Sequence, residues 1–167
     1  VDSHTSSLDT QADKKSGNKN PPQTLFTPSV SLTYAMNEAL KMVMEEGLEN
    51  RVARHHKAAK ASVAAAKALG LELFADEKVS SATVTAVKMP EGVTDAEFRG
   101  TTRDKYGVEL AGGQDHLKGN IFRIGHMGNI SYKELVQTFA AIGMTLKGLG
   151  AIEDAGAGVA SITESYL

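Results

Sequence analysis

The chain contains no cysteine, and it has no long apolar run. Without cysteine it can form no disulfide, no thiolate metal site and no cysteine nucleophile, and this composition fits a reducing compartment. No stretch approaches the roughly 20 apolar residues of a membrane span, and the polar start VDSHTSSLDT has no signal-peptide core. These absences favour a cytoplasmic protein without a membrane partner.

The chain also lacks an excess of charge of one sign. Its 167 residues include 18 Lys and Arg against 20 Asp and Glu, for a formal net charge of −2. Nothing in this balance attracts nucleic acid. Hydrophobic residues make up 41% and charged residues 23%, which is ordinary for a globular protein, and the length suits one domain with its own core.

Composition divides the chain into three parts. Residues 1–22 are rich in Ser, Thr, Asp, Lys and Asn and have almost no apolar residues, which predicts a flexible polar tail or linker. Residues 23–150 carry the periodic apolar patterns of a folded domain. Residues 151–167 are glycine-rich, and we expect a weak helix or a frayed tail there.

Within the central part the apolar period changes from helical to alternating and back. Thr94 or Asp95 is a candidate helix N-cap, and SYKE places Ser131 and Glu134 at capping-box spacing. The expected elements, in order, are helices over Val30–Met44 and Leu48–Leu69, strands over Leu71–Ala75 and Ala82–Met89, a helix over Val93–Tyr106, strands over Val108–Ala111 and Asn120–Gly125, and a helix from Asn129 or Ser131 to about Lys147. This order predicts an α+β fold, a small and mostly antiparallel sheet with helices packed on one face.

One charged side chain interrupts the last expected strand. In GGQDHLKGNIFRIGHMGN, Arg123 shares a face with Ile121 and Gly125 because strand side chains alternate. A guanidinium inside a strand needs oxygens for its fork. Arg123 could pair with a neighbouring Glu or Asp, or lie on a hydrated sheet face. It could also clamp the carboxylate of a ligand through two parallel hydrogen bonds.

The basic run in residues 51–60 has a simpler explanation. It suits a solvated helix surface, and a phosphate- or nucleic-acid-binding face is the alternative. His55 and His56 are adjacent, so they project about 100° apart on a helix and do not form an i, i+4 metal pair. We therefore expect no metal site.

Several motifs, in the same order and spacing, resemble a known family. They are FTPSVSL, EEGLENR, ALGLELF, TVTAVK, PEGV, YGVELAGG and LKGNIFRIGHMGN, over residues 23–147. This series resembles the C-terminal small domain of class V aminotransferases of the alanine–glyoxylate/serine–pyruvate type, a branch of the pyridoxal 5'-phosphate (PLP) fold-type I enzymes. The pattern G-G-x5-G-x3-R-I-G is its most specific part.

The resemblance implies roles for three residues. Arg123 matches the arginine that grips the substrate α-carboxylate. Thr27 matches a threonine that, in the family's dimer, hydrogen-bonds the PLP phosphate of the neighbouring subunit, although a threonine before proline also suits a helix start structurally. Thr24 stands where relatives have a further phosphate contact, often a tyrosine.

The glycine-rich loop offers possible ligand neighbours. Gly112 and Gly113 would leave room for backbone beside the ligand, or they could simply form turns with positive φ. His126 could touch substrate or cofactor, or be a hydrogen-bonded neighbour of the site. Relatives commonly read LGPLKG where this chain has QDHLKG, and the departures at Asp115 and His116 leave the substrate preference open.

The resemblance also says what this stretch lacks. In the family the lysine that forms a Schiff base with PLP lies in the large N-terminal domain, and no lysine here, Lys118 included, has its context. We therefore expect no transamination by this chain alone. Completed by a large domain or partner chain, as a homodimer, it would move an amino group from an alanine- or serine-like amino acid to glyoxylate or pyruvate. The alternative is a non-catalytic carboxylate-binding or oligomerisation module.

Overall fold

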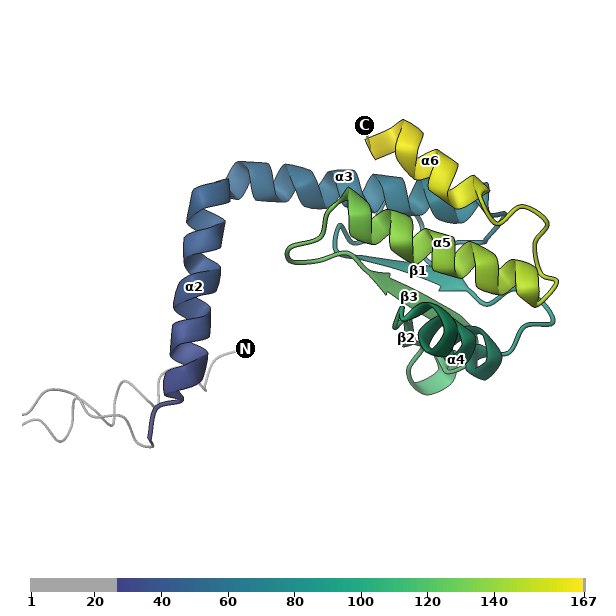
Figure 1. Cartoon of the computed structure of the whole chain (residues 1–167), viewed down its shortest axis with the longest axis horizontal. Helices are drawn as coiled ribbons and strands as arrows, with labels where there is room; N and C mark the ends of the chain where they lie inside the picture. Colours follow the sequence, from purple (N-terminus) through teal and green to yellow (C-terminus); the bar gives the residue numbers. More distant parts are fainter. Residues whose placement is uncertain (1–26, 167) are drawn as a thin grey trace, which may run out of the picture. The chain divides into compact units, whose positions relative to one another are not determined.

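The computed structural model describes residues 27–166 and divides into two units, Val1–Glu45 and Glu46–Leu167 (Figure 1). The predicted tail over residues 1–22 and the candidate Thr24 lie outside the described residues. Within the described part no helix has both the length and the apolar character needed to cross a membrane.

The described part of the first unit is dominated by one helix. Helix α2, Val30–Glu46, follows Thr27–Pro28 as the sequence predicts, and Gly47 ends it with φ of 83°. None of its residues is buried. Its exposed large apolar side chains are Val30, Leu32, Tyr34, Met36, Leu40, Met42 and Met44. Most of them share one broad side of the helix, a pattern typical of a helix that packs against something.

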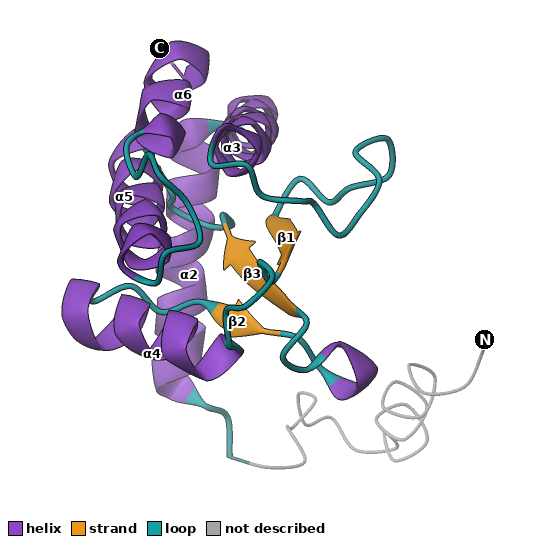
Figure 2. Cartoon of the chain, turned by 90° about the vertical axis from the view of Figure 1, so that its right-hand side faces the viewer, coloured by secondary structure: helices purple, strands orange, loops and turns teal. Residues whose placement is uncertain are grey.

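The second unit is the α+β layer that the sequence predicts (Figure 2). Its sheet has the order β1-β3-β2 with both pairings antiparallel. Helices α3, α4, α5 and α6 gather on one side of this sheet, and among the described residues of the second unit the opposite, open side carries loops and the short turn η1. The elements are α3 (Leu48–Ala68), β1 (Val84–Lys88), α4 (Asp95–Tyr106), β2 (Ala111–Gly112), the 3-10 turn η1 (Asp115–Leu117), β3 (Ile121–Gly125), α5 (Tyr132–Gly148) and α6 (Ala157–Tyr166).

The core lies between the sheet and the helices. Phe98 of α4 and Phe122 of β3 are fully buried, with ring centroids 4.7 Å apart. Buried alanines on α3 let the neighbouring helices approach closely. Gly143 of α5 allows similar closeness, because a Cβ there would lie 2.2 Å from the carbonyl oxygen of Ala155.

Both predicted helix caps are confirmed. Thr94 accepts a hydrogen bond from the Glu97 N–H at the start of α4. Ser131 and Glu134 form the complete capping box at the start of α5.

Two strand predictions are wrong in extent. The stretch Leu71–Ala75 is not a strand, and only Leu73 forms a bridge, to Val87. The Asp76 carboxylate accepts a hydrogen bond from the Lys78 N–H at 2.9 Å, and this turn leads the chain away from β1. The strand expected over Val108–Ala111 is instead β2, Ala111–Gly112, because the Val108 N–H closes the end of α4 on the Thr102 carbonyl at 3.2 Å.

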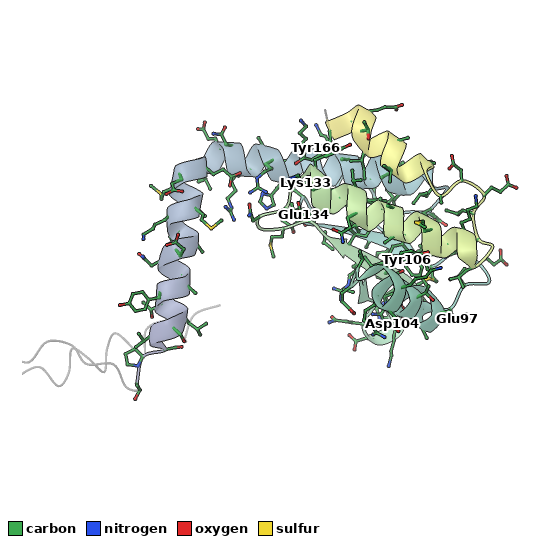
Figure 3. The ribbon with its side chains drawn as sticks, in the orientation of Figure 1. Glu97, Asp104, Tyr106, Lys133, Glu134 and Tyr166 are labelled. Carbon is green, nitrogen blue, oxygen red and sulfur yellow. The ribbon has the colours of Figure 1, made fainter. Side chains whose placement is uncertain are left out.

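The C-terminal stretch is a packed helix and not a frayed tail. Ile162 of α6 is fully buried, and Gly158 lies against Leu69 of α3. Tyr166 packs against Tyr132 with tilted rings whose centroids are 5.8 Å apart, beside the start of α5 where Figure 3 labels Lys133 and Glu134. The glycines of the C-terminal stretch thus permit close contact between helices, whereas the sequence alone predicts a weak helix or a frayed tail.

Candidate functional site

Arg123 lies on the open side of the sheet, on the face that the strand period assigns to Ile121, Arg123 and Gly125. Phe122 and Ile124 on either side are 0% and 2% exposed and face the helices, whereas Arg123 is half-buried and Gly125 is exposed. Ile121, on the Arg123 side, is buried because the turn at Gly113 packs against it. The strand therefore presents its guanidinium away from the core.

The register surrounds Arg123 with small side chains. Ala86 of β1 and Ala111 of β2 are its direct cross-strand partners. Because opposed residues of an antiparallel pair point to the same side, both share its face. Lys88 is opposite Ile121 on this face, and its ammonium pairs with Glu72. The direct neighbours of Arg123 on this face of the sheet are therefore alanines, whose side chains are short.

Arg123 makes one hydrogen bond with the described residues. Its Nε donates to the carbonyl oxygen of Gly112 at 2.9 Å. No carboxylate within residues 27–166 forms an ion pair with it. Of the two structural explanations for this arginine, the geometry matches the hydrated face and gives no Glu or Asp partner. The guanidinium is held through its Nε, and its two terminal nitrogens make no hydrogen bond with the described residues.

The paired glycines lie where a side chain would collide. A Cβ on Gly113 would be 2.0 Å from the Leu117 carbonyl oxygen, and one on Gly112 would be 3.0 Å from the Arg99 guanidinium. Neither glycine has a positive φ. Close approach of neighbouring groups therefore explains them better than turn geometry does. Their contact with a ligand stays a prediction.

His126 follows the arginine strand but is buried on the helix side. Its Nε2 lies 2.9 Å from the Thr85 hydroxyl, and its N–H donates to the Thr83 carbonyl at 3.0 Å. Burial lowers the pKa of His126, so the ring is neutral at pH 7. The side chain thus ties the end of β3 to β1. A direct contact with ligand is untested.

A cluster of side chains that the sequence does not predict fixes the loop after β3. Arg54 donates to the carbonyl oxygens of Gly128 at 2.9 Å and Ile130 at 2.8 Å. It also grips the Glu46 carboxylate with Nε and Nη2, at 2.5 and 3.0 Å. The hydrogen bond and charge of Arg54 hold the pKa of Glu46 below its usual range. Much of the predicted basic surface is therefore structural.

His55 completes this cluster. Its Nε2 accepts from the Gly128 N–H at 3.0 Å, so that nitrogen carries no proton. Its Nδ1, 2.7 Å from the Arg51 carbonyl oxygen, is then the donor. The spacing of Glu46 and Arg54, two turns apart across Gly47, is the sequence signal that could have revealed the cluster.

The remaining predicted residues lie elsewhere. Thr27 is exposed just before α2, and its cross-subunit role is a prediction. In the described part no three His, Asp or Glu side chains gather as metal ligands. A shallow hollow on α4 includes Glu97 and Asp104, which Figure 3 labels, and its lining contains no residue of the Arg123 face.

The chain is similar in sequence and in fold to known proteins, although no family model matches it. An uncharacterized aminotransferase of Methanocaldococcus jannaschii is 56% identical over 128 residues, 77% of this chain and 33% of that protein. The serine–glyoxylate aminotransferase of Arabidopsis thaliana is 38% identical over 143 residues, 85% of this chain and 35% of that protein. The crystal structure of ureidoglycine–glyoxylate aminotransferase from Bacillus subtilis superimposes with a TM-score of 0.81 at 32% identity, over 84% of this chain and 37% of that one.

Sequence and fold together define the C-terminal portion of an aminotransferase. The chain matches the C-terminal portion of class V aminotransferases, and several of these relatives are named for reactions with glyoxylate. It spans about a third of the length of the relatives that it matches.

Proposed function

We propose that Arg123 binds the carboxylate of a small amino acid or 2-oxo acid, as the carboxylate-binding part of a PLP-dependent transaminase. The observation that carries this proposal is the state of its guanidinium. It is half-buried on an open sheet face, anchored by one hydrogen bond, and has no carboxylate partner in the described part of the chain.

The geometry suits a bidentate ligand. The bond from Nε to Gly112 occupies the side edge of the fork, and the two terminal nitrogens can donate in parallel to both oxygens of a carboxylate. An arginine already held in place loses little further freedom on binding. Because Ala86 and Ala111 are small, they leave space above the guanidinium for a short substrate.

The described residues fit part of a PLP site. The hydroxyl of Thr27, just before α2, suits a phosphate, since a helix start offers unpaired N–H groups to an anion. Among the described residues of the β-strands, the lysine on the face of Arg123 is Lys88, whose ammonium is paired with Glu72. PLP, when bound, supplies the electron sink for amino transfer. In our proposal this chain supplies the carboxylate clamp and a phosphate contact, and a large domain or partner chain supplies the lysine.

A titration tests the clamp. Pyruvate or L-alanine added to the 15N-labelled chain should shift the Arg123 side-chain signal saturably, and Arg123→Ala should abolish binding. The matched control is Arg103→Ala, which removes an exposed arginine paired with Asp104 on α4. Equal pyruvate affinity in wild type and Arg123→Ala would refute the clamp.

A second assay tests the division of labour. With PLP, L-alanine and glyoxylate, the 167-residue chain should form no pyruvate beyond the rate of free PLP. The donor is alanine- or serine-like and the acceptor glyoxylate or pyruvate in the complete enzyme. Turnover above the free-PLP rate would show that the chain carries its own catalytic lysine.

One observation favours a second candidate, an oligomerisation module. Helix α2 exposes a broad apolar side that includes Leu32, Met36 and Leu40. Sedimentation of wild type against Met36→Glu tests this, with exposed Glu38→Gln as control. Association that Met36→Glu abolishes, without any pyruvate binding, would favour this candidate over the clamp.

A further inference from the structure

Gly112 is enclosed by two arginines from different elements. On its helix side lies Arg99 of α4, whose Nη2, Cζ and Nε would be 3.0, 3.1 and 3.2 Å from a Cβ built on Gly112. Three nearly equal distances mean that the flat guanidinium lies face-on against the glycine. On the other side, the Gly112 carbonyl oxygen accepts from the Nε of Arg123 at 2.9 Å.

Arg99 itself is held firmly. Its Nε and Nη2 donate to the two carboxylate oxygens of Asp95 at 2.7 and 2.6 Å, and its Nη1 donates to the Leu110 carbonyl at 3.1 Å. The hydrogen bond between them lowers the pKa of Asp95 and raises that of Arg99. Bidentate pairing fixes the plane of a guanidinium as well as its position. Arg99 therefore links α4 to Leu110, the second residue before Gly112, with its guanidinium plane fixed by Asp95.

The strand beside Arg99 is short. β2 is only Ala111–Gly112, an edge strand paired with β3 on one side. Gly112 has no side chain to restrict its backbone, and glycine is the most mobile residue. The direction of its carbonyl decides where the Nε of Arg123 can find an acceptor.

We infer that Arg99 is a positioning residue for the Arg123 clamp. It holds the Gly112 carbonyl in the direction that orients the Arg123 guanidinium toward a carboxylate ligand. This inference rests on the proposed function of Arg123. A side chain at position 112 would require the Arg99 guanidinium to move by a few tenths of an ångström.

The test uses the full chain with 15N-labelled arginine, the Arg123 signal being assigned from Arg123→Lys. In Arg99→Ala, hydrogen exchange at the Arg123 Nε–H should accelerate about tenfold, and the pyruvate Kd should rise about tenfold, as expected for one lost orienting hydrogen bond. Arg99→Lys should behave likewise, because a lysine keeps the charge beside Asp95 but has no flat guanidinium. Arg103→Ala, one turn further along α4, should change neither quantity.

A purely structural role for Arg99 gives a different pattern. Arg99→Ala would then unfold at lower denaturant while its folded form kept wild-type Nε–H exchange, and that result would overturn the inference. So would equal effects of Arg99→Ala and Arg103→Ala. If Arg99→Ala does not fold, Asp95→Asn serves instead, since it weakens the hold on Arg99. Asp95→Asn should speed the exchange severalfold, and unchanged exchange would overturn the inference.

The two claims can fail separately. If wild type shows no saturable pyruvate binding, the proposed function fails, while Nε–H exchange still decides whether Arg99 orients Arg123. If pyruvate binds to wild type and Arg99→Ala equally, only the positioning role fails.

Discussion

Two arginine regions of the second unit differ in how far their guanidinium donors are used. Arg54 donates hydrogen bonds to the Glu46 carboxylate and to the carbonyl oxygens of Gly128 and Ile130. Arg123 makes a single bond, to Gly112. Both side chains are partly buried, where unpaired donors are costly. The difference teaches that Arg54 serves the fold, whereas Arg123 has donors to spare for a ligand.

The largest expected effect is a loss of stability when a side chain is added at Gly113, in the loop before the Arg123 strand. Gly113→Ala places a Cβ 2.0 Å from the Leu117 carbonyl oxygen. Backbone atoms cannot yield cheaply, so the free energy of unfolding should fall by about 3 kcal/mol. Gly100→Ala is the control, because Gly100 lies in α4 with open space around it. It should stabilise by roughly 0.5–1 kcal/mol through helix propensity. Equal stability of the two variants in urea unfolding would contradict the packing of the loop.

The next effect is a difference in stability between Arg54→Ala and Arg123→Ala. Arg54→Ala leaves the carbonyls of Gly128 and Ile130 without their donor and should lower the free energy of unfolding by about 2 kcal/mol. Arg123→Ala removes one bond from an open face and should cost about 0.5 kcal/mol. Urea unfolding of both variants measures the difference. A larger loss in Arg123→Ala would mean that Arg123 is the structural arginine.

A smaller effect concerns pH. Burial lowers the pKa of His126 in the folded chain, so below the ordinary histidine value of about 6.5 the unfolded chain binds more protons. Stability should therefore be full above that value and fall as pH decreases from 7 to 5. His126→Gln should flatten the fall, and exposed His116→Gln should not. An unchanged slope in His126→Gln would show that His126 takes up its proton without cost.

Local patterns predicted much of this fold because they report local chemistry. The helices, both caps and the face of Arg123 follow from periodicity and hydrogen-bonding side chains over a few residues. The short β2 and the single bridge at Leu73 depend on turns that compete for the same backbone groups. Helix α6 depends on close contacts with α3, which no local pattern reveals.

In the candidate site, too, some features follow from local sequence patterns and others depend on the folded backbone. The strand pattern placed Arg123, and the resemblance supplied its role as a carboxylate clamp. The contacts of Arg99 and the cluster of Arg54 with Glu46 join residues through the folded backbone. The Asp95–Arg99 spacing on one helix and the Glu46–Arg54 spacing across Gly47 are the sequence signals of these pairs. Hydrogen bonds to backbone carbonyls cannot be predicted from residue types, because every residue has a carbonyl.

The most direct measurement is the effect of pyruvate on thermal unfolding, compared between Arg54→Ala and Arg123→Ala. A ligand that binds only the folded state raises its melting temperature. Pyruvate should raise the Tm of wild type and of the less stable Arg54→Ala, and should leave the Tm of Arg123→Ala unchanged. A pyruvate-dependent rise in Arg123→Ala equal to that of wild type would contradict the claim that Arg123 is the ligand's arginine.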